Sequence, residues 1–216
     1  MAFHPTQSLT EQIADHLSKE IITGQMPAGE RIQELRIAKT LQVSRGSVRE
    51  ALLVLAGRHL IDLLPRRGAM VRPLDQDAIV HISELAAGLT TLLFQRAARA
   101  NRAVQGEALA GFDQHLQQMR EQLNESGGFG FLQSLYGFFA AALPLPRDIY
   151  LEETLRNLFP AAQRVSYKAL QNPRYHRSET LDFASSLRTA VAGQEIDAVP
   201  NLVVAHFKRE SEIARS

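Results

Sequence analysis

Residues 43–55 constrain the fold most strongly, because they predict a short helix whose two faces differ in chemistry. The apolar residues recur at intervals of three and four and form one stripe: Val48, Ala51, Leu52 and Leu55. Ser44 is the expected N-cap, since its hydroxyl can accept a hydrogen bond from the first turn. Arg45 and Arg49 are four residues apart and therefore share one outward face. Two guanidinium groups on one face suit phosphates or a guanine edge, although an arginine pair alone also fits an ordinary solvated helix.

A second amphipathic helix is predicted just upstream, over residues 32–41, with three side chains facing inward: Leu35, Ala38 and Leu41. Residues 42–44 leave only a tight connection between the two helices. Two short helices joined in this way form a helix-turn-helix, whose second helix enters the major groove of DNA. Another helix is expected over residues 9–23, with Thr10 as its cap.

Two short strands are predicted after the helix-turn-helix, at residues 60–64 and 69–72. The turn between them contains Arg66, Arg67 and Gly68, and the glycine permits backbone conformations that a side chain hinders. Arginines at a hairpin tip can reach the DNA backbone or the adjacent minor groove. The pattern therefore predicts the winged form of the motif.

Residues from about 9 to 73 resemble the winged helix-turn-helix of the GntR family of bacterial transcription regulators. The matching segments keep the family's order and spacing: residues 21–24, 27–32, 43–52 and 65–71. The resemblance implies that Arg45 and Arg49 contact guanine edges or flanking phosphates, with Ser47 near the bases. Further implied contacts lie along the DNA backbone and at the wing tip: Arg36, Ser44, Arg66, Arg67 and Gly68. In well-known relatives an arginine stands at the position of Leu35, and Arg36 lies about 100° round the helix from it.

Basic residues are concentrated in this amino-terminal part. The whole chain of 216 residues has a net charge of only +1, but residues 31–72 contain nine Lys or Arg against three Asp or Glu. A local excess of positive charge favours binding to the negatively charged backbone of DNA. The chain has no cysteine, which excludes disulfides and fits a reducing cytoplasm. We expect no signal peptide, and residues 79–94, the most apolar run, are too interrupted and too short for a membrane span.

The remainder of the chain has a helical pattern throughout. Six helices are predicted, at residues 76–102, 105–124, 128–142, 147–170, 176–193 and 195–215. We therefore expect a mainly α protein with two domains. Residues 1–74 form the winged helix-turn-helix with its small β-hairpin, and residues 75–216 form an antiparallel bundle. The second half resembles the effector-binding and dimerisation domain of the FadR branch of GntR regulators.

Many members of that branch bind a divalent metal through one Asp and three His inside the bundle, and the metal helps to hold a carboxylate effector. The resemblance places these ligands at Leu135, Phe139, Ala184 and His206, of which only His206 can bind a metal. We expect no metal and no cofactor. Together with Phe138, these residues suggest a cavity for a rather apolar small-molecule effector. The same apolar pattern also fits a bundle core, and His206 also fits a buried histidine bonded to a neighbour.

The leading hypothesis is a cytoplasmic, sequence-specific DNA-binding transcription regulator, usually a repressor. A homodimer would bind a near-palindromic double-stranded DNA operator, because the half-sites must match the two-fold axis of the protein. One alternative is an effector-less regulator whose helical domain only dimerises, and another is a partner-binding helical module. We expect no enzyme, because the sequence has no GxSxG, P-loop, HExxH or paired-carboxylate spacing.

Overall fold

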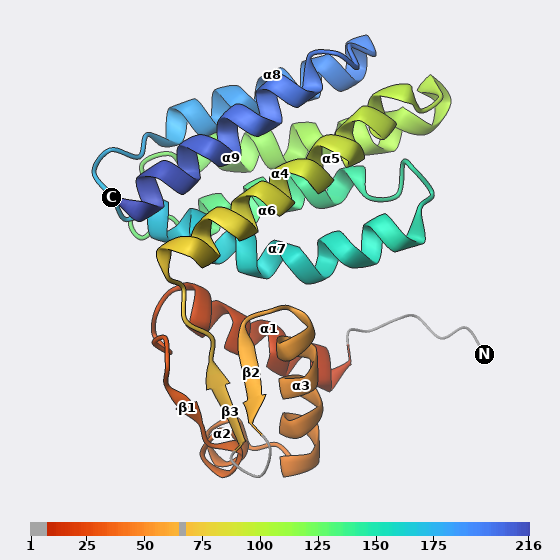
Figure 1. The fold of residues 1–216 in the computed structure, drawn as a ribbon. Coiled ribbons are helices and arrows are strands. Elements are labelled where there is room, and N and C mark those ends of the chain that lie inside the picture. Colours follow the sequence, from red (N-terminus) through yellow and green to blue (C-terminus); the bar gives the residue numbers. More distant parts are fainter. Residues whose placement is uncertain (1–7, 65–67) are drawn as a thin grey trace, which may run out of the picture. The chain divides into compact units, whose positions relative to one another are not determined.

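The computed structural model describes residues 8–64 and 68–216. The chain divides into two compact units, Met1–Leu74 and Asp75–Ser216. The first unit combines short helices with a small sheet, and the second is helical (Figure 1). The prediction of a mainly α protein, with a winged helix-turn-helix followed by a helical bundle, is confirmed.

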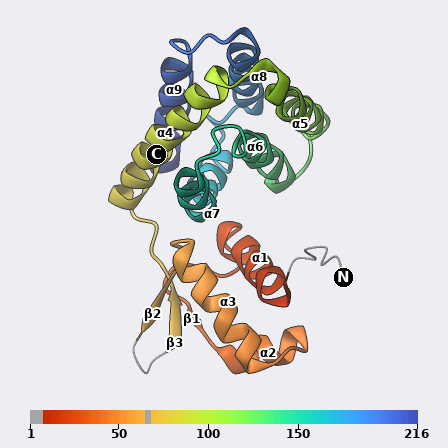
Figure 2. The ribbon, with the colours of Figure 1, turned by 90° about the vertical axis from the view of Figure 1, so that its right-hand side faces the viewer.

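The first unit contains three helices and three strands within its described residues. In chain order they are α1 (Leu9–Ile22), β1 (Arg31–Ile32), α2 (Glu34–Leu41), α3 (Arg45–Gly57), β2 (Ile61–Leu64) and β3 (Gly68–Val71). The apolar stripe predicted for α3 is fully buried and packs against α1. α2 lies beside the amino-terminal end of α3 (Figure 2).

The sheet is antiparallel in the order β1-β3-β2. β2 and β3 form the predicted hairpin, in which Ile61 lies opposite Val71 and Leu64 opposite Gly68. The third strand, β1, was not predicted, because residue 32 was assigned to the start of the following helix. Ile32 instead pairs with Ala69, and this long-range pairing delays the start of α2 to Glu34.

The cap predicted for the first helix was wrong by two positions. Ser8, not Thr10, is the N-cap of α1, and its hydroxyl accepts a hydrogen bond from the backbone N–H of Glu11. The Glu11 side chain in turn accepts from the Ser8 N–H, which completes a capping box. The Thr10 hydroxyl donates to Glu50 at 3.0 Å and so links α1 to α3.

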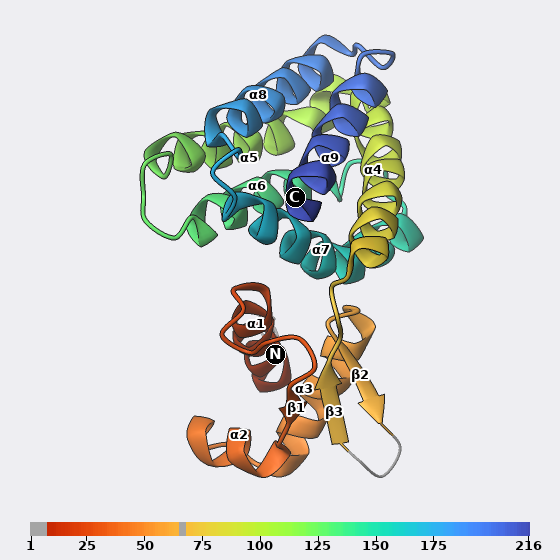
Figure 3. The ribbon, with the colours of Figure 1, turned by 60° about the vertical axis from the view of Figure 1, so that its left-hand side comes forward.

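The second unit contains the six predicted helices, each with its limits no more than four residues from those expected. They are α4 (Gln76–Arg99), α5 (Arg102–Glu121), α6 (Phe129–Ala142), α7 (Ile149–Leu170), α8 (Arg177–Gly193) and α9 (Val199–Arg215). α4 packs along α9 and also contacts α7 and α8, while α5 packs against α6 (Figure 3). By length and composition α4 could cross a membrane, but apolar helices of bundle cores pass the same test.

Candidate functional site

The start of α3 is held in place by local hydrogen bonds. The Ser44 hydroxyl accepts from the Ser47 backbone N–H at 3.0 Å, so Ser44 is the N-cap as predicted. The preceding residue Gln42 ends α2 in the left-handed conformation, with a φ of 56°. Because of this turn, only residues 42–44 separate the end of α2 from the start of α3 at Arg45.

Arg45 and Arg49 extend from α3 into solvent, with 62 % and 68 % of their side chains exposed. Both converge on Glu34 of α2, which is largely buried. The Arg49 guanidinium donates to the two carboxylate oxygens of Glu34 at 3.3 and 3.1 Å, and a nitrogen of Arg45 lies 3.7 Å from the same carboxylate. The hydrogen bonds to Glu34 raise the pKa of Arg49. The two arginines therefore form an exposed cationic pair positioned by a single carboxylate.

α2 carries an exposed cation of its own, Arg36. Arg36 donates to Glu30 at 2.7 Å and remains exposed. Leu35 was predicted to face inward, but it is 51 % exposed, and Ile37 is buried instead. α2 starts at Glu34 rather than at residue 32, and its buried residues are Ile37 and Ala38. Leu35 therefore lies on the outer surface next to Arg36.

The hairpin predicted to be a wing is described only in part. Arg66 and Arg67 lie outside the described residues. Gly68 has a φ of +81°, a conformation that favours glycine, and is exposed at the start of β3. Below the turn, Arg72 donates to Asp62 at 3.0 and 2.6 Å and so ties the ends of the two strands together.

The residues proposed for an effector cavity lie in the core of the helical unit. Leu135, Phe138, Phe139 and Ala184 are completely buried, and Phe139 contacts several aromatic rings within 6.2 Å. His206 is buried too, and its ring stacks on Phe183 at a centroid distance of 4.0 Å. The five predicted residues thus belong to one apolar region, and their role in binding an effector stays a prediction.

A buried polar network beside this region was not predicted from the sequence. Its centre is Glu210, which accepts hydrogen bonds from Ser166 at 2.5 Å and from Tyr175 at 2.9 Å. The Tyr136 hydroxyl lies 3.0 Å from Ser166. Burial raises the pKa of both tyrosines, so they remain neutral donors at physiological pH. The spacing of Glu210 four residues after His206 was the available signal, since it places both on one helix face.

His206 has an unusual environment for a buried imidazole. Its Nε2 lies 3.6 Å from a carboxylate oxygen of Glu210, and neither ring nitrogen has a hydrogen-bond partner within the described part of the chain. Burial lowers its pKa and favours the neutral form. The neighbouring positions Leu135, Phe139 and Ala184 offer no donor atoms, so these residues do not fit the metal of the FadR branch. Among the described residues no group of three or more His, Cys, Asp or Glu could hold a metal ion.

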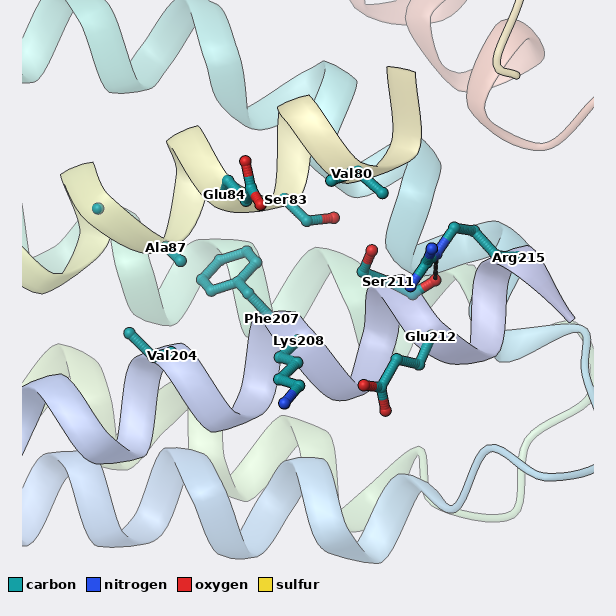
Figure 4. A pocket seen from close by; sticks show the side chains of 11 residues that line it. Val80, Ser83, Glu84, Ala87, Val204, Phe207, Lys208, Ser211, Glu212 and Arg215 are labelled. Carbon is teal, nitrogen blue, oxygen red and sulfur yellow. Dashed lines mark hydrogen bonds between the residues drawn. The ribbon is translucent and has the colours of Figure 1, made fainter. Parts of the chain in front are cut away.

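A groove of about 460 Å³ lies between α4 and α9, and it is lined by other residues than those predicted for the pocket (Figure 4). Its floor is apolar and is formed by Val80, Ala87, Gly88, Val204 and Phe207. Its polar side chains are Ser83, Glu84, Lys208, Ser211, Glu212 and Arg215. The sequence analysis assigned none of these positions to a binding site. Each of the two helices has an ordinary amphipathic pattern, and the groove exists only where the two helices pack together.

Comparison with known proteins agrees with this geometry. Residues 9–71 match the family model described as bacterial regulatory proteins, gntR family. The HTH-type transcriptional repressor RspR of Escherichia coli (strain K12) is 27 % identical over 98 % of this chain and 91 % of its own length. The gluconate operon transcriptional repressor of Bacillus licheniformis is 36 % identical over 42 % of this chain and 37 % of its own length.

The solved structure of E. coli McbR/YncC has the same fold, with a TM-score of 0.79 and 16 % identity, over 97 % of this chain and 98 % of that one. The sequence relatives are transcription regulators and not enzymes. The matching model covers the two helices that carry Arg36, Arg45 and Arg49. Residues 9–71 are therefore similar to the helix-turn-helix domain of the gntR family, and the whole chain is similar to transcriptional regulators that carry this domain.

Proposed function

We propose that the protein is a dimeric, sequence-specific DNA-binding repressor. The observation that carries this proposal is the exposure of Arg45 and Arg49 side by side on α3, the second helix of the helix-turn-helix. In this motif the amino-terminal residues of the second helix contact base edges in the major groove. Arginine binds the O6 and N7 atoms of guanine with two hydrogen bonds. RspR, similar over nearly the full chain, is named a repressor, which supports the direction of regulation.

The remaining predicted contacts have supporting roles in this proposal. Arg36 and Ser44 contact the DNA backbone, Ser47 lies near the bases, and Arg66, Arg67 and Gly68 act at the wing tip. Phosphate contacts position a protein on the duplex, whereas contacts to base edges distinguish sequences. Arg45 and Arg49 should therefore determine which operator is bound. The proposed location is the cytoplasm, because that is where the DNA of a bacterium lies.

The test is to measure operator binding by the variants Arg45→Ala and Arg49→Ala. The operator is first obtained by selecting bound fragments from genomic DNA. Each variant should weaken operator binding by roughly 5- to 150-fold and bind unrelated DNA nearly as well as before. Arg156→Ala is the matched control, because Arg156 is an equally exposed arginine paired with a glutamate, but on α7. Unchanged operator affinity in both variants would refute the assignment.

We also propose that the chain belongs to the FadR branch and that its helical unit binds a small-molecule effector. The apolar region around Leu135, Phe138, Phe139 and Ala184, with His206 as a polar group, is the proposed effector site. Ligand sites are commonly apolar with a few polar groups, and both ring nitrogens of His206 lack partners among the described residues. The effector would have to favour one arrangement of the dimer over another.

A thermal-shift screen of fatty acids, acyl-CoAs and sugar acids tests for such an effector. A ligand that binds the folded chain raises the unfolding temperature in a concentration-dependent way. His206→Ala should reduce that shift, and His16→Ala, a change of an exposed histidine on α1, should not. If no compound shifts the temperature, the alternative of a regulator whose helical domain only dimerises is favoured.

A further inference from the structure

Glu210 of α9 is the residue on which the hydrogen bonds of the buried polar network converge. Ser166 has a single hydroxyl proton and donates it to one carboxylate oxygen of Glu210, so the Tyr136 hydroxyl must be the donor to Ser166. Tyr175 donates its own proton to the other carboxylate oxygen. Both oxygens of Glu210 therefore accept, as those of an ionised carboxylate do. The network thus places a negative charge inside the helical unit.

The positive charge of the network lies at its other end. Because the proton of Tyr175 goes to Glu210, the Thr180 hydroxyl must be the donor to Tyr175, at 2.8 Å. A guanidinium nitrogen of Arg209 donates to Thr180 at 2.7 Å. Two hydroxyl groups therefore separate Arg209 from Glu210 along the network. The side chain of Arg209 is 24 % exposed, whereas that of Glu210 is 2 % exposed.

Glu210 also determines how the His206 ring is protonated. The Nε2 atom of His206 lies 3.6 Å from a carboxylate oxygen of Glu210, which is too long for a hydrogen bond but close enough for a strong electrostatic effect. A neutral imidazole has one N–H donor and one acceptor nitrogen. The carboxylate attracts an N–H group at Nε2 and repels a lone pair there. We therefore expect the proton on Nε2, with Nδ1 as the acceptor.

The acceptor at Nδ1 of His206 is buried and has no donor within the described part of the chain. Buried polar groups nearly always have a partner, so a hydrogen-bond donor is needed at this atom. Burial lowers the pKa of His206, and among the charges that act on it Glu210 opposes this shift more strongly than Arg209 adds to it. The electrostatic environment of the ring is therefore negative, and it favours donors and positive charge over a second carboxylate.

We propose that the effector site around His206 binds an apolar molecule that ends in a hydroxyl or amino group, and that it excludes carboxylic acids. The inference rests on the effector named in the proposed function and specifies its chemical class. The terminal group donates to Nδ1 of His206, and the apolar body lies among aromatic rings such as Phe183 and Phe207, whose centroids are 4.0 and 5.3 Å from that of His206. A carboxylate would instead bring lone pairs against Nδ1 and a second negative charge near Glu210.

This choice of ligand is the reverse of the one implied by the resemblance to the FadR branch. There a metal cation helps to hold a carboxylate effector. Here the other three positions of the metal site are Leu135, Phe139 and Ala184, and the charge nearest to His206 is the anion of Glu210. With the cation replaced by an anion, the favoured polar group of the ligand changes from an acceptor to a donor.

The first test compares three ligands with one skeleton: phenylpropanol, phenylpropylamine and phenylpropanoate. Each is titrated into the full-length chain at neutral pH, and binding is measured from the shift in unfolding temperature. The alcohol and the amine should each bind at least about 10-fold more tightly than the acid. His206→Phe removes the acceptor and can keep the stacking on Phe183, so this variant should lose most of the affinity for the alcohol.

The variant Glu210→Gln tests the origin of the preference. It removes the buried negative charge, so the ratio of amine affinity to acid affinity should fall by about 10-fold or more. Glu212→Gln is the matched control, because it removes the same charge from an exposed position of the same helix. It should leave the ratio nearly unchanged.

A measurement on the natural chain does not depend on whether Glu210→Gln folds. NMR of a chain with isotope-labelled histidines distinguishes a protonated from an unprotonated ring nitrogen, and the signals of His206 are those missing from His206→Phe. In the ligand-free chain Nε2 should carry the proton and Nδ1 should not. The Nδ1 signal should move when phenylpropanol is added and stay in place when phenylpropanoate is added.

A proton on Nδ1 of the ligand-free chain, or tighter binding of the acid than of the alcohol and the amine, overturns the inference. If acids bind and His206→Phe abolishes their binding, the proposed effector site stands and only its chemical class is wrong. If neither these three compounds nor those of the wider screen shift the unfolding temperature, the proposed effector fails and the inference fails with it. DNA binding through Arg45 and Arg49 is tested separately and survives each of these results.

Discussion

Glu34 and Arg49 are joined by two hydrogen bonds across the helix-turn-helix, at 3.3 and 3.1 Å. Arg45 lies 3.7 Å from the same carboxylate, so a single acid on α2 orients both arginines of α3. This carboxylate has two opposite effects on DNA binding. It restricts the guanidinium groups to one region, and its negative charge opposes the approach of phosphates.

Replacing Glu34 by Gln should therefore increase binding to unrelated DNA and reduce discrimination. Glutamine has a similar shape but removes the negative charge, so non-specific affinity should rise by about 3- to 10-fold at low salt. Fluorescence anisotropy with operator and non-operator duplexes at several salt concentrations measures both effects. The control is Glu20→Gln, which removes an equal charge from α1. If Glu34→Gln behaves like the control, the carboxylate has no such role.

Replacing Ser44 by Ala should destabilise the helix-turn-helix. The change removes the acceptor for the Ser47 N–H, and losing such a cap costs about 1 kcal/mol of the free energy of unfolding. Urea unfolding followed by circular dichroism gives the value. Ser44→Asp keeps an acceptor at this position and should retain most of the stability. Equal stability of the alanine and natural proteins would contradict the capping role.

Replacing Gln42 by Gly should stabilise the chain. Gln42 has a φ of 56°, and side chains make this left-handed conformation unfavourable. The gain should be up to about 1 kcal/mol, because the greater freedom of glycine in the unfolded state offsets part of the relief. Gln194→Gly, at the end of α8, has a φ of 59° and should behave similarly. Gln33→Gly, where φ is −96°, should bring no gain in the same thermal unfolding experiment.

Replacing His206 by Phe should make the helical unit less sensitive to acid. Burial lowers the pKa of His206 below its ordinary value of 6.5, while Glu210 opposes and Arg209 adds to this shift. Unfolding restores the ordinary value, so below about pH 6.5 the unfolded chain binds more protons and stability falls as the pH falls. Above that pH the imidazole is neutral in both states, and its contribution is constant.

Phenylalanine cannot be protonated and can keep the stacking on Phe183. The variant should lose part of the decline in unfolding temperature between about pH 6.5 and pH 5. His16→Phe, on the exposed side of α1, is the control and should keep the full decline. If the unfolding temperature of His206→Phe falls with pH as it does in the natural chain, the buried imidazole does not contribute to the loss of stability in acid.

The sequence by itself determined the elements whose signals are local. The apolar spacing and the Ser44 cap defined α3, and the breaks between apolar runs placed all six helices of the second unit within a few residues. Hydrogen bonds and side-chain contacts inside a helix connect residues three or four positions apart, so sequence spacing records them directly. The exposed pair Arg45 and Arg49 was predicted for the same reason.

The tertiary structure decided what depends on residues far apart in the chain. Ile32 pairs with Ala69 in the sheet, so α2 starts only at Glu34. The packing of α2 buries Ile37 and Ala38 and leaves Leu35 exposed. Glu34 meets Arg49 across 15 positions, and Glu210 meets Ser166 across 44. No local pattern specifies such contacts, because they form only when the packing of the whole unit brings the side chains together.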